Sequence, residues 1–183
     1  MVLAKLCRRV PILRHQASVS IFRQKHFRIT SDRSGDKPQN HRFYANSQLS
    51  VMGEQQIEAA KHKAAEKAVE EHFDPSFGHV GIGSGSTIRF VVEAIKNVLP
   101  SNSTTKFVPT GYQSRQVIMQ AGLTPMLYDS LPENVMLEVA FDGADEVDDE
   151  LNCVKGGGAC LFQEKLVATR AKKFVCVAGA AVL

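Results

Sequence analysis

The sequence has few of the features that mark a membrane protein, a secreted protein or a metal-binding protein. It contains no long apolar run that would span a bilayer and no secretory signal segment. Four cysteines occur, but none forms a C-x-x-C pair and no histidines gather beside them, which argues against a zinc site. With 44% apolar and 22% charged residues, the composition is typical of a soluble globular protein with reduced, mostly buried thiols.

Acidic residues are scarce at the start of the chain, where residues 1–43 hold only Asp32 and Asp36 among many arginines and lysines. The net charge of +3 therefore describes this segment, and the acidic remainder gives no support for nucleic-acid binding. The segment resembles a mitochondrial transit peptide, and a disordered basic extension explains it equally well. We set residues 1–50 aside and expect a cytoplasmic protein, with a mitochondrial location as the alternative.

Apolar patterns along the rest of the chain predict strands that alternate with helices. The apolar segment 174–178 is typical of a central parallel strand. The sequence therefore predicts the α/β class with a mostly parallel sheet. We expect helices at 54–73, 88–95, 113–120 and 159–170, and strands at 79–83, 107–109, 126–128, 137–141, 152–155 and 174–178.

A turn rich in glycine and hydroxyl groups joins the first predicted strand to the next helix. It reads Gly81-Ile82-Gly83-Ser84-Gly85-Ser86-Thr87. Free backbone N–H groups and a helix N-terminus suit an anion such as phosphate, although an ordinary tight turn explains the glycines as well. The turn has no lysine for a P-loop, no third glycine for a dinucleotide fingerprint and no nucleophile elbow.

Two acidic side chains, Asp142 and Asp145, directly follow the predicted strand 137–141. In open α/β sheets, ligands bind beyond the carboxyl ends of the strands, so this pair is placed to hold a sugar hydroxyl or a metal ion. A solvated acidic loop is the simpler explanation, because further acids follow. Metal binding is the weaker functional reading.

Three further features carry possible chemistry. Lys155 precedes Gly156, Gly157 and Gly158, where close backbone approach and a positive charge would stabilise a developing oxyanion, unless the segment is only a linker. Glu164 has apolar helical neighbours, and desolvation favours a carboxylate as a general base; a first-turn glutamate that stabilises the helix dipole is equally compatible. Lys61 interrupts an apolar helix face, which fits either a snorkelling side chain or a contact to phosphate.

These motifs together resemble the ribose-5-phosphate isomerase A family. Gly-Ile-Gly-Ser-Gly-Ser-Thr, Asp-Gly-Ala-Asp-Glu, Lys-Gly-Gly-Gly and Gln-Glu-Lys occur in the family's order and spacing, over about residues 59–178. Each motif is weak alone, and the set is specific. The resemblance implies a Rossmann-like three-layer sandwich and an enzyme that interconverts D-ribose 5-phosphate and D-ribulose 5-phosphate through an enediolate without a cofactor.

The resemblance also implies roles for individual residues. Glu164 matches the catalytic base, Asp142 and Asp145 match paired aspartates that help to open the sugar ring, and Lys155 matches the charge-stabilising lysine. The remaining matches would bind the sugar phosphate, and the lysine among them aligns more loosely: Lys61, Ser84, Gly85, Ser86, Thr87, Gly156, Gly157 and Gly158. Family members are homo-oligomers, which is the partner expected for a full-length protein.

The chain departs from the family pattern near its end. The family's smaller C-terminal α+β domain has no counterpart here, and Gly179 stands where an aspartate is typical. Residues 51–183 would then be an incomplete catalytic domain, with an apolar edge strand and weak activity or none by itself. A related sugar-phosphate isomerase or deaminase, a CoA transferase, and a non-catalytic sugar-phosphate-binding paralogue are the rival readings.

Overall fold

The computed structural model describes residues 17–22, 47–147, 153–155 and 160–179. Seven strands and four α-helices lie in these ranges, together with one short 3-10 helix. In chain order they are β1 (Ala17–Phe22), α1 (Ser47–His72), β2 (His79–Ile82), α2 (Ile88–Val98), β3 (Lys106–Pro109), α3 (Tyr112–Gln120), η2 (Tyr128–Ser130), β4 (Val139–Asp142), β5 (Glu146–Val147), β6 (Cys153–Val154), α4 (Leu161–Thr169) and β7 (Phe174–Gly179).

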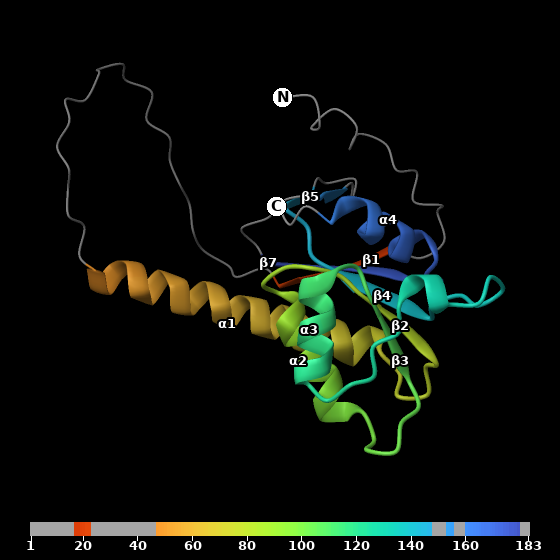
Figure 1. The fold of residues 1–183 in the computed structure, drawn as a ribbon. Helices are drawn as coiled ribbons and strands as arrows, with labels where there is room; N and C mark the ends of the chain where they lie inside the picture. Colours follow the sequence, from red (N-terminus) through yellow and green to blue (C-terminus); the bar gives the residue numbers. More distant parts are fainter. Residues whose placement is uncertain (1–16, 23–46, 148–152, 156–159, 180–183) are drawn as a thin grey trace.

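Five of the strands form one sheet in the order β1-β7-β4-β2-β3, and every neighbouring pair runs parallel (Figure 1). Strands β5 and β6 form a separate antiparallel pair. The prediction of an α/β protein with a mostly parallel sheet is confirmed. Parallel strands point their carboxyl ends to one edge of the sheet, and this edge positions the site described below.

Helices cover both faces of the sheet, as a parallel sheet requires. Helices α1 and α2, with Ile118 of α3, pack on one face, where the largest apolar cluster includes Val80, Phe107 and Phe141. On the opposite face, Val167 of α4 packs with a smaller cluster that includes Ala140. In Figure 1, α4 lies above the sheet and α1 to α3 lie below it, which gives the expected three layers.

Local sequence explains where these elements begin and end. Helix α2 buries Ile88, Val91 and Ile95 on one side, which is the period of an amphipathic helix. Helix α3 is closed by Gly122, which adopts a φ of +73° and donates its N–H to the carbonyl of Met119. A glycine tolerates this left-handed conformation, so the expected stop of the third helix is confirmed.

The strand predicted at residues 126–128 is wrong. The chain makes a single bridge there, between Pro125 and Phe107 of β3, and then enters the 3-10 turn at Tyr128. Backbone hydrogen bonds join Thr124 and Met126 to Phe107, but Leu127 is 53% exposed and the chain turns at Tyr128, so no strand continues along β3.

Strand β1 and the start of α1 lie within residues 1–50, which the sequence analysis set aside from the fold. Strand β1 pairs with β7 over six residues, from Ala17 opposite Phe174 to Phe22 opposite Gly179. The outer edge of β7, expected to be exposed, is thus paired with the chain's own N-terminal segment. The rest of residues 1–46 lies outside the described ranges.

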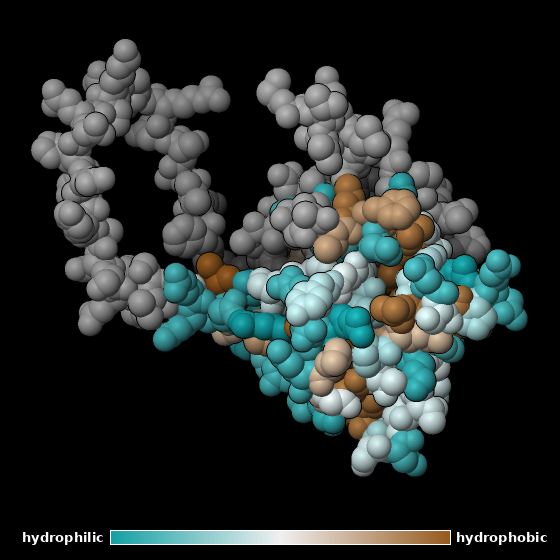
Figure 2. Space-filling model, in the orientation of Figure 1, coloured by the Kyte–Doolittle hydropathy of each residue, from teal (hydrophilic) through white to brown (hydrophobic). Residues whose placement is uncertain are grey.

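The surface of the described region is unevenly polar. Figure 2 shows hydrophilic side chains along much of α1 and apolar ones on the side that carries α4. Phe162 of α4 is 73% exposed and contributes to that apolar side. Within the described ranges, no helix is both long and apolar enough to cross a membrane.

Candidate active site at the carboxyl edge of the sheet

Three neighbouring strands end in polar side chains at the same edge of the sheet. Ser84 follows β2, Thr110 follows β3, and Asp142 is the last residue of β4. All three side chains are buried. The hydroxyl oxygens of Ser84 and Thr110 are 2.8 Å apart and share a hydrogen bond. The polar side chains at this edge are therefore buried and hydrogen-bonded, and do not belong to a solvated loop.

Asp142 is the centre of this edge. Its Oδ1 accepts hydrogen bonds from the backbone N–H of Gly143 at 2.7 Å and of Ser84 at 3.2 Å. Gly83 makes this approach possible, because a β-carbon at that position would overlap the Asp142 carboxyl group. Gly83 is therefore required by the close approach of Asp142, whether or not a ligand binds at the turn.

Lys155 and Glu164 complete a cluster with Asp142, in which a partly buried ammonium lies between two buried carboxyl groups. The Lys155 Nζ lies 3.2 Å from Asp142 Oδ1 and 3.2 Å from Glu164 Oε1. Glu164, in the first turn of α4, is 4% exposed, and its Oε2 has no hydrogen-bond partner among the described residues. Of the two readings left open for Glu164, the buried carboxylate is confirmed.

Burial and mutual attraction set the protonation of this cluster. Desolvation raises the pKa of Asp142 to about 6, against the opposing pull of Lys155 and with a smaller push from Glu164. Burial by itself disfavours the Lys155 ammonium, but attraction to Asp142 and Glu164 outweighs it, so the pKa of Lys155 lies above its ordinary value. The Lys155 ammonium therefore keeps its charge between the side chains of Asp142 and Glu164.

The serine-rich turn lies between this cluster and α1. Gly85 has a φ of +117°, and Ser86 is exposed beside it. Lys61 of α1 donates a hydrogen bond from Nζ to Ser86 Oγ at 3.0 Å. Glu58 pairs with Lys61 at 2.8 Å and also with Arg89 of α2. The structure therefore brings the loosely aligned lysine to the turn, which apolar periodicity alone left undecided.

The predicted site residues differ in what they contact. Asp142, Lys155 and Glu164 meet directly, and Lys61 meets Ser86 on the other side of the turn. Thr87 is half-buried at the N-cap of α2, and Asp145 is exposed directly before β5. The triple glycine, residues 156–158, lies outside the described residues.

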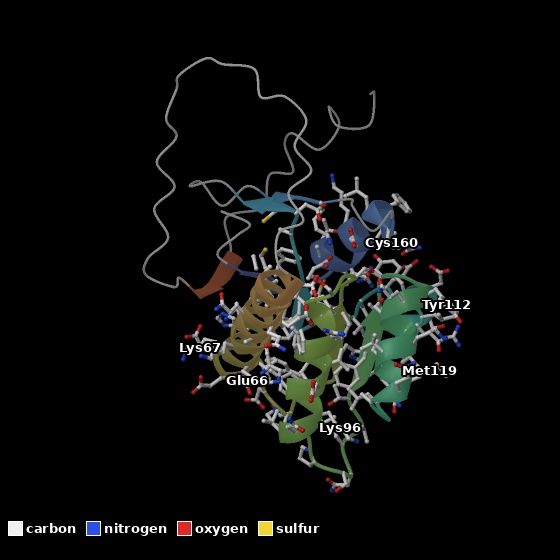
Figure 3. The ribbon with its side chains drawn as sticks, turned by 90° about the vertical axis from the view of Figure 1, so that its left-hand side faces the viewer. Glu66, Lys67, Lys96, Tyr112, Met119 and Cys160 are labelled. Atoms are coloured by element: carbon white, nitrogen blue, oxygen red, sulfur yellow. The ribbon has the colours of Figure 1, made fainter. Side chains whose placement is uncertain are left out.

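Sequence reasoning missed Thr110. It occupies the same structural position after β3 that Asp142 occupies at the end of β4, so the rule of strand ends would have identified it. Cys160, the N-cap of α4, was also missed as a neighbour: its Sγ lies 2.8 Å from where a β-carbon of Gly111 would be. Figure 3 shows Cys160 beside the end of α3 that carries Tyr112.

This arrangement suits proton transfer next to a carbonyl. A buried carboxylate oxygen can take a proton, and an adjacent ammonium can stabilise negative charge that develops on oxygen. Among the described residues, no group of three or more His, Cys, Asp or Glu side chains is gathered as a metal site.

Comparisons with known sequences point in one direction. The family model described as ribose 5-phosphate isomerase A (phosphoriboisomerase A) matches residues 106–181. The ribose-5-phosphate isomerase of Debaryomyces hansenii is 53% identical over 122 residues, which cover 67% of this chain and 47% of that protein. The one from Candida albicans is 51% identical over 122 residues, which cover 67% and 49%. The chain thus spans about half the length of the curated relatives it matches.

Solved structures agree with the sequence matches. Ribose 5-phosphate isomerase A from Neisseria gonorrhoeae superposes with a TM-score of 0.61 at 35% identity, over 69% of this chain and 53% of that one. A D-ribose-5-phosphate isomerase in complex with phospho-erythronic acid gives a TM-score of 0.59 at 33% identity, over 66% and 51%.

Proposed function

This chain belongs to the ribose-5-phosphate isomerase A family, and from that premise we propose that it interconverts D-ribose 5-phosphate and D-ribulose 5-phosphate. The observation that carries the proposal is the Lys155 ammonium, held 3.2 Å from both the Asp142 and the Glu164 carboxylates at the carboxyl edge of the sheet. The reaction needs no redox partner, because it moves one proton from C2 to C1 and one from O2 to O1 within the same molecule.

The turn of residues 84–87 binds the phosphate group of the substrate in this proposal. Three features support it. The hydroxyl of Ser86 is exposed, and Gly85 has a positive φ and no side chain to cover the backbone. The Lys61 ammonium lies within hydrogen-bond distance of Ser86. The N-terminus of α2 follows at once and adds favourable dipole charge. Glu58 holds Lys61 when no anion is present.

Glu164 moves the proton. With the sugar open, its Oε2 takes the proton from C2 of the aldose, and the electron pair forms the C1–C2 double bond of an enediolate while the C1 carbonyl oxygen becomes negative. The protonated Glu164 then returns the proton to C1, and C2 becomes the carbonyl carbon of the ketose. Burial of Glu164 among apolar neighbours keeps the transferred proton from exchanging freely with water.

Lys155 stabilises the negative charge of the enediolate, and Asp142 transfers the hydroxyl protons. The Lys155 ammonium stabilises the enediolate oxygen, and its contact to both carboxylates fixes its position before the substrate arrives. With a pKa of about 6, Asp142 gains and loses its own proton at little cost near neutral pH, so it can act as a general acid or base toward the sugar hydroxyls in ring opening and the O1–O2 proton shift.

Replacement of Glu164 by glutamine tests the proposal. Glutamine preserves the size of the side chain but cannot accept a proton, so we expect kcat to fall by about 10²–10⁴-fold while KM changes little. The measurement is the rate of conversion of D-ribose 5-phosphate to D-ribulose 5-phosphate.

Lys165→Gln provides the matched control, because Lys165 neighbours Glu164 on α4 but is exposed. Its rate should equal that of the unsubstituted protein. A Glu164→Gln rate close to normal would refute the role of Glu164. Binding of the sugar phosphate without any turnover by the unsubstituted chain would favour the rival reading of a non-catalytic sugar-phosphate-binding protein.

A further inference from the structure

Two cysteines that the proposed reaction does not use lie against each other beside the site. Cys176 of β7 is 1% exposed, and Cys153 of β6 is partly buried and packs against the small cluster formed by Cys176 and Ala178. Their side chains share a hydrogen bond, and both thiols are reduced in the structure. The two residues come from strands of different sheets, so a bond between them would tie the β5–β6 pair to the main sheet.

Each cysteine lies near a residue of the charged cluster: Cys176 through strand pairing and Cys153 along the chain. Cys176 lies directly opposite Asp142 in the pairing of β7 with β4. Cys153 precedes Lys155 by two residues, and Lys155 directly follows the strand that carries Cys153. A bond between the pair would therefore join β7, at the residue opposite Asp142, to the segment that carries Lys155.

We propose that Cys153 and Cys176 form a reversible disulfide with a low-molecular-weight disulfide, such as oxidised glutathione, as the oxidant, and that this bond lowers the activity of the adjoining site. The Cys153 thiolate attacks one sulfur of the oxidant, whose S–S bond breaks and releases a first thiol. The Cys176 sulfur, after losing its proton, attacks the Cys153 sulfur of the mixed disulfide and releases a second thiol. The protein loses two hydrogen atoms, and the oxidant is reduced to two thiols.

The order of attack follows from the surroundings of the two thiols. Cys153 is partly accessible, whereas Cys176 is buried. The hydrogen bond that the Cys176 thiol donates to the Cys153 sulfur, together with burial, holds the pKa of the Cys176 thiol above its ordinary value. Cys153 is therefore the sulfur that meets the oxidant, and Cys176 resolves the mixed disulfide.

The disulfide would disturb Lys155. A disulfide brings its sulfurs to about 2.05 Å, closer than two hydrogen-bonded thiols, so Cys153 must move toward β7. Lys155 follows within two residues, and its ammonium depends on two contacts of 3.2 Å. Misplacement of a catalytic group by about 1 Å costs roughly 10²-fold in rate, so we expect kcat to fall by about 10- to 100-fold.

The full chain, incubated with oxidised glutathione and then with dithiothreitol, tests the proposal. Peptide mapping should show a Cys153–Cys176 link with the loss of two hydrogens, and dithiothreitol should remove the link and restore kcat. Before oxidation, Cys153→Ala should have the same rate as the unsubstituted protein. After incubation with oxidised glutathione, it should form no such link and its rate should not fall. Cys176→Ala is a second variant with the same expectation. Cys160→Ala is the matched control, because it removes the other described free thiol and should still form the link.

Each result decides the proposal. A glutathione adduct that persists on Cys153 without the link, or a link between other cysteines, would overturn it. A Cys153–Cys176 link that leaves kcat unchanged would overturn its effect on the site. The map does not depend on turnover, so a chain that forms the link but never converts ribose 5-phosphate, even when reduced, would contradict the proposed isomerase function and retain the thiol pair as a modification site.

Discussion

Asp142 shows how one residue couples the stability of the fold to pH. Its pKa is raised from 3.8 to about 6, chiefly by desolvation, so the folded state holds this proton more tightly than the unfolded chain does. The stabilisation from this proton is fully present below about pH 4 and is lost as the pH rises through about 6. At about 1.4 kcal/mol per pKa unit, the change is on the order of 3 kcal/mol at most.

Replacement of Asp142 by asparagine should remove this dependence. Asparagine stays neutral at every pH, so the free energy of unfolding of Asp142→Asn relative to the unsubstituted protein should rise by about 1–3 kcal/mol between pH 4 and pH 6.5. Urea unfolding at a series of pH values measures it, with the exposed Asp129→Asn as a control for the loss of a carboxylate. Parallel curves for Asp142→Asn and the unsubstituted protein would show that burial does not perturb Asp142.

At the scale of single residues, tertiary structure decided which side chains meet. Sequence motifs correctly identified Asp142, Lys155 and Glu164 as residues with possible chemistry. Nothing in the spacing of residues 142, 155 and 164 fixes a lysine between two carboxylates, because that contact depends on how β4 and α4 pack. Thr110 could have been identified from its position after a predicted strand, but its contact with Ser84, 26 residues away, depends on how the strands pack.

At the scale of elements, the contact between β2 and α4 positions the proposed base. Helix α4 rests on the sheet through Val167, three residues after Glu164 on the same helix. Val167 can pack this closely on β2 because residue 81 is a glycine and has no side chain. A β-carbon at Gly81 would lie 2.6 Å from Val167 Cγ1 and 2.8 Å from the Ala140 β-carbon, both closer than packed carbon atoms approach.

Gly81→Ala should therefore displace α4 from the sheet. We expect the free energy of unfolding to fall by about 1–3 kcal/mol, the usual cost of overpacking a core, and kcat to fall because Glu164 moves with the helix. Gly78→Ala is the control, since a β-carbon there meets nothing within 4 Å. Chemical denaturation of both variants measures the effect. Equal stabilities would show that α4 adapts without cost.

At the scale of the whole molecule, the N-terminal segment completes the sheet. Strand β1 pairs with the outer side of β7, whose residues Val175 to Ala178 are all buried. Without β1, the N–H and C=O groups on that side of β7 would be unpaired, and unpaired edges of this kind associate with other chains.

Prolines in β1 test this role of the segment. In Val19→Pro with Ser20→Pro, one of the two prolines removes an N–H that faces β7, because successive N–H groups point to opposite sides of a strand. We expect concentration-dependent self-association, measured by sedimentation velocity. Val19→Ala with Ser20→Ala keeps both N–H groups and should sediment like the unsubstituted protein. Identical sedimentation of the proline and alanine variants would mean that β1 does not protect the edge.

The sequence by itself determined the α/β class, most strand and helix positions and the four motifs, because hydrophobic periodicity and turn chemistry are local properties of the chain. It misplaced the element near Pro125, where the chain makes one bridge to β3 and then turns at Tyr128, and it left out β1, whose pairing partner lies more than 150 residues away.

Only the tertiary structure decided that Lys155 lies between Asp142 and Glu164, that Lys61 reaches the serine turn and that Cys153 packs on Cys176. Such contacts depend on how the strands order themselves within the sheet and how the helices cover it. That packing arises from burial of the whole core, and no short stretch of sequence contains it.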